Sequence, residues 1–317
     1  DKCAELLPDY FSFVKGLVDS EDLSLNISRE TLQHDGQLKL IAKTLEKKIK
    51  SELEKMLKDE REAYEEFFKA FGIQLKFGIY NDYGAHKETL RDLLIFRSSN
   101  EKKYVTLKEY VSRMKEGQDS IYYACGETDE KIDMLPQTDA VKDKGFEILY
   151  LTENVDEFAL KMLAEYDGKK FVNICDNDLN LDSEDEKKAL EEENTAAKDM
   201  FEAMKESLGD KINAVRFTNK LKDHPVCLTS EGGISLEMEK VLNSMPGAEQ
   251  NKVKAQLVLE INANHPIAEK LKTLYTEDKD TLGKYAKLLY GEACLIGGKS
   301  VPDPAEHSAL VCELMTK

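Results

Sequence analysis

One arginine stands at the end of an acidic, serine-rich segment near the start of the chain. Arg29 follows the stretch 18–28, and a long amphipathic pattern begins soon after it. Ser28 is a plausible N-cap, which would place Arg29 in a first helical turn, where the helix dipole disfavours positive charge. A cation held there could serve an anionic partner. The alternative is a local ion pair with a neighbouring carboxylate, which the residue types alone favour: Glu21, Asp22 or Glu30.

The other residues that usually carry catalysis or bind metals are scattered. The five histidines do not cluster with carboxylates or thiols at ligand spacing, so no metal site is predicted. The six cysteines form no CxxC pair, which favours reduced, mostly buried thiols over a disulfide framework or a zinc site. No serine stands in a nucleophile elbow. These residues therefore supply no complete active site.

The segment Gly297-Gly298-Lys299-Ser300 is similar to the end of a phosphate-binding loop. The full pattern needs a glycine at position 293, where this chain has Ala293, and a strand before it, where a helical pattern runs instead. We therefore predict that the two glycines end a helix. A self-contained NTPase built around this segment is the weakest of the alternative functions.

A stripe of apolar residues at helical spacing lies in the segment 234–245. Gly232-Gly233 before it and Pro246-Gly247 after it would allow a mobile, exposed helix. Flexible methionine side chains suit the recognition of varied hydrophobic partners. The alternative is an ordinary core-facing helix, which the same spacing also predicts. The stripe consists of Ile234, Met238, Val241, Leu242 and Met245.

The first half of the chain changes from helical to mixed patterns. Residues 36–71 carry apolar side chains at steps of three and four, which predicts one long helix ended by Gly72. Short helices and strands then alternate, with a turn at Asp167-Gly168, which predicts an α/β layer with parallel strand pairs. The expected helices span 86–96, 107–114 and 157–165, and the expected strands span 120–124, 147–151 and 171–174.

The second half begins with a charge run at 181–206, which is typical of a solvated helix or linker and suggests a domain boundary. Strands are predicted around Val215 and Phe217 and after His224-Pro225. Residues 253–261 alternate apolar and mostly polar positions, as in a half-buried strand. Helices are predicted at 281–296 and 304–315.

These patterns predict an α/β (α+β) protein of several domains. We expect a mainly helical region at 1–72 and an α/β layer at 73–180. A charged linker helix at 181–206 then leads to a further mixed domain at 207–317.

Composition narrows the possible partners. The chain has 317 residues and a net charge of −17, from 62 acidic and 45 basic side chains. This charge argues against binding to nucleic acid or to anionic membranes. No apolar stretch is long enough to span a bilayer and no signal peptide is visible, so we expect a soluble, cytoplasmic protein. The first residue, Asp1, suggests that the chain is a trimmed piece of a longer protein.

Several sequence blocks, taken together, are similar to one family. Asp19–Leu23 and Leu25–Glu30 are followed in order by further blocks at 112–118, 121–123, 126–127, 144–150, 156–158 and 167–170. In order and spacing they resemble the middle domain of the ninety-kilodalton heat-shock chaperones, the bacterial HtpG type in particular. Weaker similarity continues to the C-terminus. The resemblance implies α/β/α middle-domain layers joined by helices to a C-terminal dimerisation domain. Residues 1–72 would then be the end of a large middle subdomain with its connecting helices, 73–180 a small α/β/α middle subdomain, and 207–317 the dimerisation domain.

The same resemblance implies an ATP-dependent molecular chaperone that binds partly folded client proteins. The family's N-terminal ATP-binding domain is absent from this sequence. ATP and Mg²⁺ are therefore expected in the full-length protein, whereas this chain alone should hold no cofactor and should not be catalytic. A rival from another class is a non-catalytic, acidic, dimeric scaffold for one fixed protein partner.

The resemblance also assigns roles to residues. Arg29 would contact the γ-phosphate of ATP, with Asn26 and Gln33 in support. Phe158 matches an exposed aromatic position that contacts clients, and the stripe at 234–245 matches a client-binding helix. The last two helices would form a homodimer by a four-helix contact. The expected contact residues are Leu282, Tyr285, Leu289, Ile296, Leu310, Val311 and Leu314.

Overall fold

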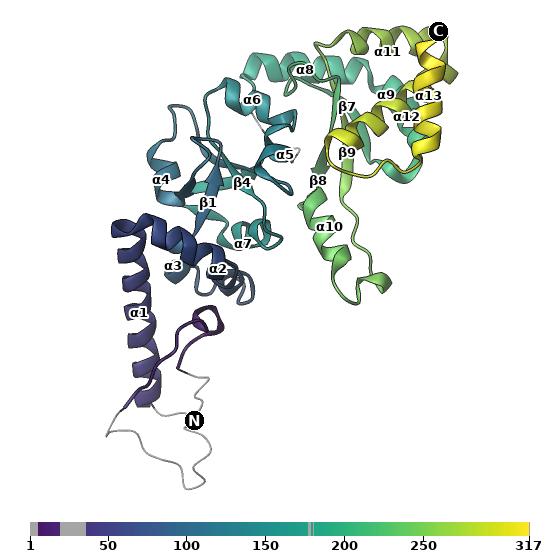
Figure 1. Ribbon diagram of the computed structural model, residues 1–317. Helices are drawn as coiled ribbons and strands as arrows, with labels where there is room; N and C mark the ends of the chain where they lie inside the picture. Colours follow the sequence, from purple (N-terminus) through teal and green to yellow (C-terminus); the bar gives the residue numbers. More distant parts are fainter. Residues whose placement is uncertain (1–5, 20–35, 177–178, 180, 317) are drawn as a thin grey trace. The chain divides into compact units, whose positions relative to one another are not determined.

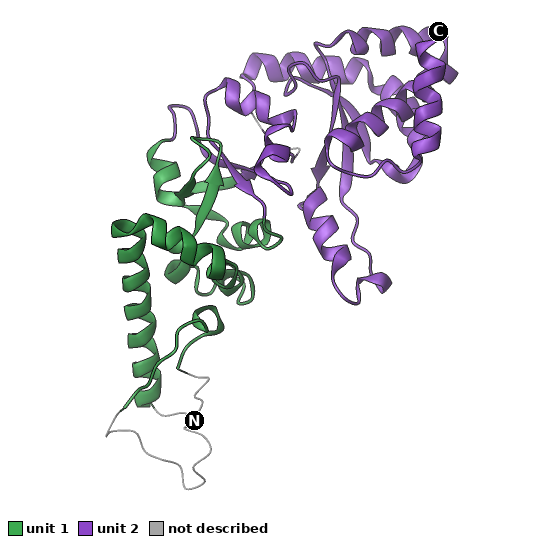
Figure 2. Cartoon of the chain, viewed as in Figure 1, with its two compact units in different colours: residues 1–113, 153–171 green, residues 114–152, 172–317 purple. Residues whose placement is uncertain are grey.

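The computed structural model describes residues 6–19, 36–176, 179 and 181–316 (Figure 1). The chain divides into two compact units, Asp1–Arg113 with Glu153–Phe171 and Met114–Thr152 with Val172–Lys317 (Figure 2). The described strands form a six-stranded sheet, in the order β2-β1-β4-β3-β6-β5, and a three-stranded sheet, in the order β7-β9-β8. Helices and mixed sheets together confirm the predicted α+β class.

The first unit is mainly helical. The strands β1 and β2 pair antiparallel, and β5 pairs antiparallel with the start of β6. Its elements are the 3₁₀ turn η1 (Asp9–Phe11), α1 (Gly36–Asp59), α2 (Arg61–Tyr80), α3 (Lys87–Leu90), η2 (Arg91–Leu93), β1 (Ile95–Ser98), β2 (Tyr104–Thr106), α4 (Leu107–Ser112), α7 (Asp156–Leu163) and β5 (Glu165–Tyr166).

The long helix predicted for 36–71 is two helices. They meet at Glu60, whose backbone is not helical (φ −136°, ψ 56°), and α2 continues to Tyr80. The prediction that Gly72 ends the helix is therefore wrong. Gly72 makes room instead, because a Cβ built there would come within 2.7 Å of the Phe68 ring. A glycine inside a helix is tolerated where a large neighbour fills its space.

The helix predicted for 86–96 is also wrong in its second half. It consists of α3 and η2, after which Ile95 and Phe96 form strand β1 and are fully buried. The turn predicted at Asp167-Gly168 is confirmed. Both residues have positive φ (48° and 74°), as a type I′ hairpin turn requires, and they connect β5 to β6.

The second unit begins with parallel strands and ends with helices around the three-stranded sheet. The strands β3 and β4 pair in parallel. Its elements are β3 (Ser120–Cys125), α5 (Asp129–Asp133), α6 (Gln137–Asp143), β4 (Ile148–Leu151), the last two residues of β6 (Lys169–Asn173), α8 (Glu184–Ala196), α9 (Lys198–Leu208), η3 (Gly209–Lys211), β7 (Ala214–Thr218), β8 (Val226–Glu231), α10 (Leu236–Ser244), η4 (Ala248–Gln250), β9 (Gln256–Asn262), α11 (Pro266–Glu277), α12 (Lys279–Ile296) and α13 (Pro304–Met315).

Strand β9 is the centre of the second unit. It pairs in parallel with β7 and antiparallel with β8. Leu257, Leu259 and Ile261 belong to the core that includes side chains of α9, α11 and α12. Val258 and Glu260, which point to the other face, are also buried, at 0% and 1% exposure. The prediction of a half-buried strand is therefore wrong, because β9 is covered on both faces as well as paired on both edges.

The charge run forms ordinary helix. Ser183 and Glu186 make a capping box at the start of α8, in which each side chain bonds to the other residue's backbone N–H. Every residue of α8 is at least partly exposed. The last two predicted helices are confirmed as α12 and α13.

Candidate functional site

The apolar stripe at 234–245 is carried by the short helix α10, which extends from the ends of β8 and β9 (Figure 1). Ser235 caps the helix, because its hydroxyl accepts a hydrogen bond from the Met238 N–H at 3.0 Å. Ile234 precedes the cap, and Met245 follows the helix in an extended conformation. The stripe is therefore helical only from Leu236 to Ser244.

The side chains of the stripe differ in exposure. Val241 points inward at 8% exposure, and Ile234 packs against the core of the three-stranded sheet. Met238 and Leu242 are half-buried, whereas Met245 is 44% exposed. We name the last three residues, Met238, Leu242 and Met245, the α10 surface. An incoming apolar side chain could contact these three, whereas Val241 is buried and Ile234 already packs against the core.

Two polar side chains attach α10 to the segment that leads into β9. The Asn243 side chain accepts from the Val253 N–H at 2.9 Å and donates to the Val253 carbonyl oxygen at 2.8 Å. Glu239 Oε2 accepts from the Ala255 N–H at 2.8 Å. These bonds satisfy the backbone of an otherwise irregular segment and hold the helix against it. Sequence reasoning missed both residues, because they look like ordinary solvent-facing positions.

Phe158 is not the exposed aromatic residue that was predicted. It lies on α7 at 6% exposure, with its ring centroid 5.4 Å from that of Tyr80 on α2 in an edge-to-face contact. The prediction of exposure is wrong, because α7 packs against α2 and the ring fills the space between them. Its role in client contact stays a prediction.

A buried ion pair lies between the same two helices. Lys76 Nζ is 2.5 Å from Asp156 Oδ1, and their side chains are 6% and 3% exposed. The ammonium also lies 5.2 Å from the Phe68 ring centroid and 5.4 Å from that of Phe96. Burial raises the pKa of Asp156, and the positive charge of Lys76 opposes that shift. Sequence reasoning missed this pair, because no local pattern shows which carboxylate Lys76 meets.

The seven residues predicted for the dimer contact fall into two groups. Leu282 and Leu289 belong to the chain's own core at 1% and 5% exposure, and Leu310 is 8% exposed. The other four, Tyr285, Ile296, Val311 and Leu314, are partly exposed. A second copy could therefore contact mainly the second group, and the dimer itself stays a prediction.

Helices α12 and α13 are joined within the chain by ion pairs. Lys284 Nζ lies 2.6 Å from Glu313 Oε1, and Lys287 Nζ lies 2.6 Å from Glu306 Oε1. Large apolar residues remain uncovered at the ends of the two helices, where Leu295 is 55% exposed and Met315 is 81% exposed. The two helices are therefore held together within the chain and still expose apolar side chains at their ends.

The residues predicted to act on ATP, Arg29, Asn26 and Gln33, lie outside the described residues. Their roles rest on the sequence alone.

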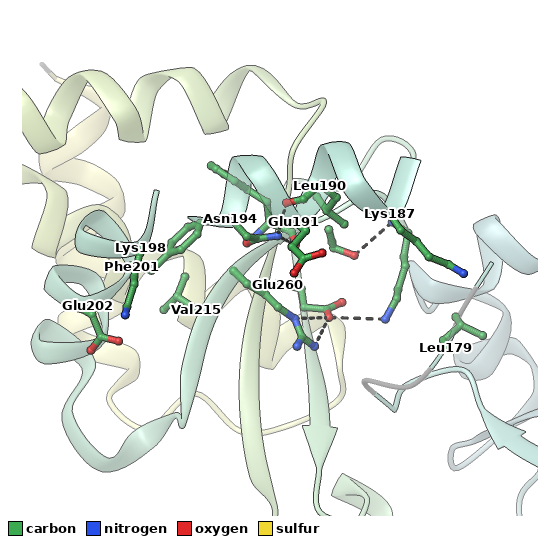
Figure 3. A pocket seen from close by; sticks show the side chains of 14 residues that line it. Leu179, Lys187, Leu190, Glu191, Asn194, Lys198, Phe201, Glu202, Val215 and Glu260 are labelled. Carbon is green, nitrogen blue, oxygen red and sulfur yellow. Dashed lines mark hydrogen bonds and ion pairs between the residues drawn. The ribbon is translucent and has the colours of Figure 1, made fainter. Parts of the chain in front are cut away.

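A cavity of about 680 Å³ lies beside β7, between that strand and helices α8 and α9 (Figure 3). At its base the Glu260 carboxylate, 1% exposed, receives hydrogen bonds from Arg216 at 2.6 and 3.0 Å and lies 3.7 Å from Lys220 Nζ. Burial raises the pKa of the neighbouring Cys227 thiol well above its usual range, and the negative charge of Glu260 adds a smaller shift in the same direction. The thiol is therefore a poor nucleophile, and the charges at the base are paired within the chain.

The glycine-rich segment ends α12, as predicted. The Gly297 N–H donates to the Ala293 carbonyl oxygen at 3.0 Å, and Gly298 has a φ of 69°. Within the described ranges, no group of three or more His, Cys, Asp or Glu side chains is arranged to hold a metal ion. None of the described helices combines the length and the apolar character needed to cross a membrane.

Comparisons with known proteins agree with the resemblance seen in the sequence. The sequence model of the family described as "Hsp90 protein" matches residues 1–317. The chain is 56% identical over 315 residues to "Chaperone protein HtpG" of Bacillus subtilis (strain 168), covering 99% of this chain and 50% of that protein. The proteins of the same name from Clostridium perfringens (strain 13 / Type A) and Alkaliphilus oremlandii (strain OhILAs) are 56% and 55% identical over 315 residues, with the same coverage. The chain thus spans about half the length of the curated relatives it matches.

Proposed function

Because the chain belongs to the Hsp90 protein family, we propose that it is the client-binding and dimer-forming part of an ATP-dependent molecular chaperone. The whole protein would act in the cytoplasm on partly folded proteins. ATP and Mg²⁺ would be held by a part of the longer protein outside this chain. Family membership supports the general function, and the α10 surface supports the assignment of client binding to this part.

The observation that carries client binding is the exposure of apolar side chains on an anchored helix. Met245 is 44% exposed beside the half-buried Met238 and Leu242, while Asn243 fixes the helix through two hydrogen bonds. Unbranched methionine side chains adapt to different apolar partners at low cost. Partly folded proteins expose varied apolar segments, so such a surface suits them better than it suits one fixed partner.

The proposed ATP-related role belongs to Arg29. Charge develops on the γ-phosphoryl oxygens during phosphoryl transfer, and an arginine from another part of a protein can stabilise it. Asn26 and Gln33 would support the segment that presents this arginine. In the full-length protein, Arg29→Ala should lower the kcat of ATP hydrolysis and leave ATP affinity nearly unchanged. Equal hydrolysis by both proteins would remove Arg29 from the proposed function.

The dimer contact is proposed for α12 and α13. Sedimentation equilibrium of this chain should give the mass of a dimer, and a variant that ends before Asp303 should give the mass of a monomer. Asp303 is the boundary because its carboxylate caps α13 by accepting from the Glu306 N–H at 2.8 Å. Monomers in both cases would contradict the contact.

Client binding is tested by the suppression of aggregation of a thermally unfolding protein. The double variant Met238→Asp with Leu242→Asp places two charges on the α10 surface, so suppression should be lost while the sedimentation mass stays that of the dimer. Leu40→Asp is the control, because it puts one such charge on an apolar residue of α1 that is 60% exposed. Full suppression by the double variant would contradict the proposal.

A further inference from the structure

Helix α10 is joined by ion pairs to parts of the second unit that are distant in the sequence. Lys299 Nζ lies 3.1 Å from Glu239 Oε1, and Lys240 Nζ lies 3.1 Å from Glu127 Oε1. Since Glu239 Oε2 accepts from the Ala255 N–H, each oxygen of this carboxylate has its own donor. Glu239 therefore connects α10 both to the segment before β9 and to the turn after α12.

The two ion pairs differ in their exposure to water. The side chains of Glu239 and Lys299 are 18% and 31% exposed, whereas those of Lys240 and Glu127 are both 56% exposed. Water and dissolved salt screen an exposed pair more strongly than a partly buried one. The Glu239–Lys299 pair is therefore the stronger of the two connections.

The backbone around Lys299 is well fixed. The Lys299 N–H donates to the Cys294 carbonyl oxygen at 2.8 Å, and the Gly298 N–H donates to the Leu295 carbonyl oxygen at 3.2 Å. Gly298 adopts the left-handed conformation that this turn needs, with a φ of 69°. The turn that resembles a phosphate-binding loop thus presents its lysine to a carboxylate of the same chain.

A cavity of about 450 Å³ borders this ion pair. Glu239 and Lys299 line it together with Leu208, Leu257 and Tyr290. Within α10 itself, Val241 is the buried residue. A helix with so little buried apolar surface depends on polar contacts for its orientation.

We propose that Lys299 is a positioning residue for the α10 surface, which it couples to α12 and α13 through Glu239. The inference rests on the proposed client-binding function of α10. A change in α12 or α13 would move the turn that carries Lys299 and would alter how Met238 and Leu242 are presented. By linkage, a client bound to α10 would act back on the contact made by α12 and α13 to the same extent.

The test measures binding of a permanently unfolded probe, fluorescently labelled, reduced and carboxymethylated α-lactalbumin, by fluorescence anisotropy. Lys299→Met keeps the aliphatic stem and removes the charge, and should weaken binding about three- to fivefold at low salt. Lys299→Arg should bind as the unmodified chain does. Lys240→Met is the matched control on the exposed pair of the same helix, and it should change binding by less than Lys299→Met does.

Two further readouts separate positioning from a general loss of structure. Glu239→Gln keeps an acceptor for the Ala255 N–H but loses the attraction to Lys299, so it should match Lys299→Met, and the double variant should be no weaker than either. About 1 M NaCl should bring the unmodified chain to the affinity of the variants. Additive losses that do not depend on salt, or unchanged binding by Lys299→Met, would overturn the inference.

The failure of this inference can be told from the failure of the proposed function. If Met238→Asp with Leu242→Asp leaves probe binding intact, the client-binding function itself is wrong. If that variant abolishes binding while Lys299→Met has no effect, only the positioning role is wrong. Hydrogen exchange gives an answer without any client, because Lys299→Met should accelerate exchange of the α10 amides. Equal protection in both proteins would overturn the positioning role.

Discussion

Two lysine–carboxylate pairs in this chain have nearly the same chemistry and very different surroundings. Lys76 and Asp156 join α2 to α7 at 2.5 Å, with side chains 6% and 3% exposed. Lys299 and Glu239 join the turn after α12 to α10 at 3.1 Å, with side chains 31% and 18% exposed. Aromatic rings enclose the first pair, and a cavity borders the second.

The surroundings of each pair decide what the pair contributes to the protein. Removing one partner of a buried pair leaves a charge without water or counter-charge, so the cost is large and the geometry is effectively permanent. Removing one partner of a half-exposed pair costs little, because water replaces it. The packing of α2 on α7 is therefore a matter of stability, whereas the orientation of α10 can be adjusted by small changes in charge or salt.

The largest effect is expected from Lys76→Met. The variant leaves the Asp156 carboxylate buried without its cation, which should lower the free energy of unfolding by about 3–5 kcal/mol. Urea denaturation followed by circular dichroism measures the loss. Lys69→Met is the control, because it breaks an exposed pair on the same helix, with Glu66 at 2.5 Å. A loss no larger than that of the control would show that the buried pair stabilises nothing.

The stability of the same variant should also depend on pH. Burial raises the pKa of Asp156 and Lys76 opposes that shift, so the pKa of Asp156 should rise further in Lys76→Met, where the charge and the hydrogen bond of Lys76 are lost. A carboxyl whose folded pKa exceeds its unfolded pKa stabilises the fold below the unfolded value and loses that contribution as pH rises through the folded value. The deficit of Lys76→Met relative to the unmodified chain should therefore be smaller at pH 5 than at pH 7. A deficit that does not change with pH would mean that Asp156 is not the cause.

Phe158→Ala should have the next largest effect. The ring is 6% exposed and fills the contact between α7 and α2, so its removal should cost about 3 kcal/mol in unfolding free energy. Phe158→Leu keeps most of the volume and should cost less. Thermal denaturation of both variants checks the order. A fully stable Phe158→Ala would restore the idea of a surface residue available to clients.

Asn243→Ala should have a smaller and local effect. It removes the two hydrogen bonds to Val253 at 2.8 and 2.9 Å, at a cost of about 1–2 kcal/mol. Because α10 buries little, this cost should appear as faster hydrogen exchange in residues 236–255 and hardly at all in the global midpoint. Ser244→Ala is a control at the exposed end of the same helix. If the midpoint falls as far as for Phe158→Ala, α10 is part of the global core and the comparison fails.

The sequence predicted those features that depend on local pattern. Apolar spacing and end signals gave α12 and α13, and the Asp167-Gly168 turn followed from its residue types, because each is decided within a few residues. Gly72 was misjudged, since its space is filled by the Phe68 ring and not by solvent. Strand β9 was misjudged because alternation could not show that Glu260 meets Arg216 from a neighbouring strand.

Of the candidate site, the sequence indicated the side chains but not their exposure. Met238 and Leu242 were found by spacing, whereas the partners of Glu239 and Asn243 depend on where a later segment returns. The exposure of Phe158 could not be predicted either, because the sequence is the same whether an aromatic residue on a helix faces water or the ring of Tyr80. Charged residues such as Lys76 are the hardest to place, since only the fold brings the opposite charge to them.

The smallest effect on stability is expected from Lys240→Met, which breaks the exposed ion pair between Lys240 and Glu127. Hydrogen bonds and charge from Lys131 and Lys240 lower the pKa of Glu127 to about 2. A depressed pKa gives stability that is present above the ordinary carboxyl value and is lost as pH falls toward the folded one. Since Glu127 is exposed, solvent screens the gain, and the thermal midpoint at pH 7 should not change measurably. A fall in the midpoint as large as that of Phe158→Ala would mean that exposure does not separate the ion pairs, and the contrast with Lys76 would then need another cause.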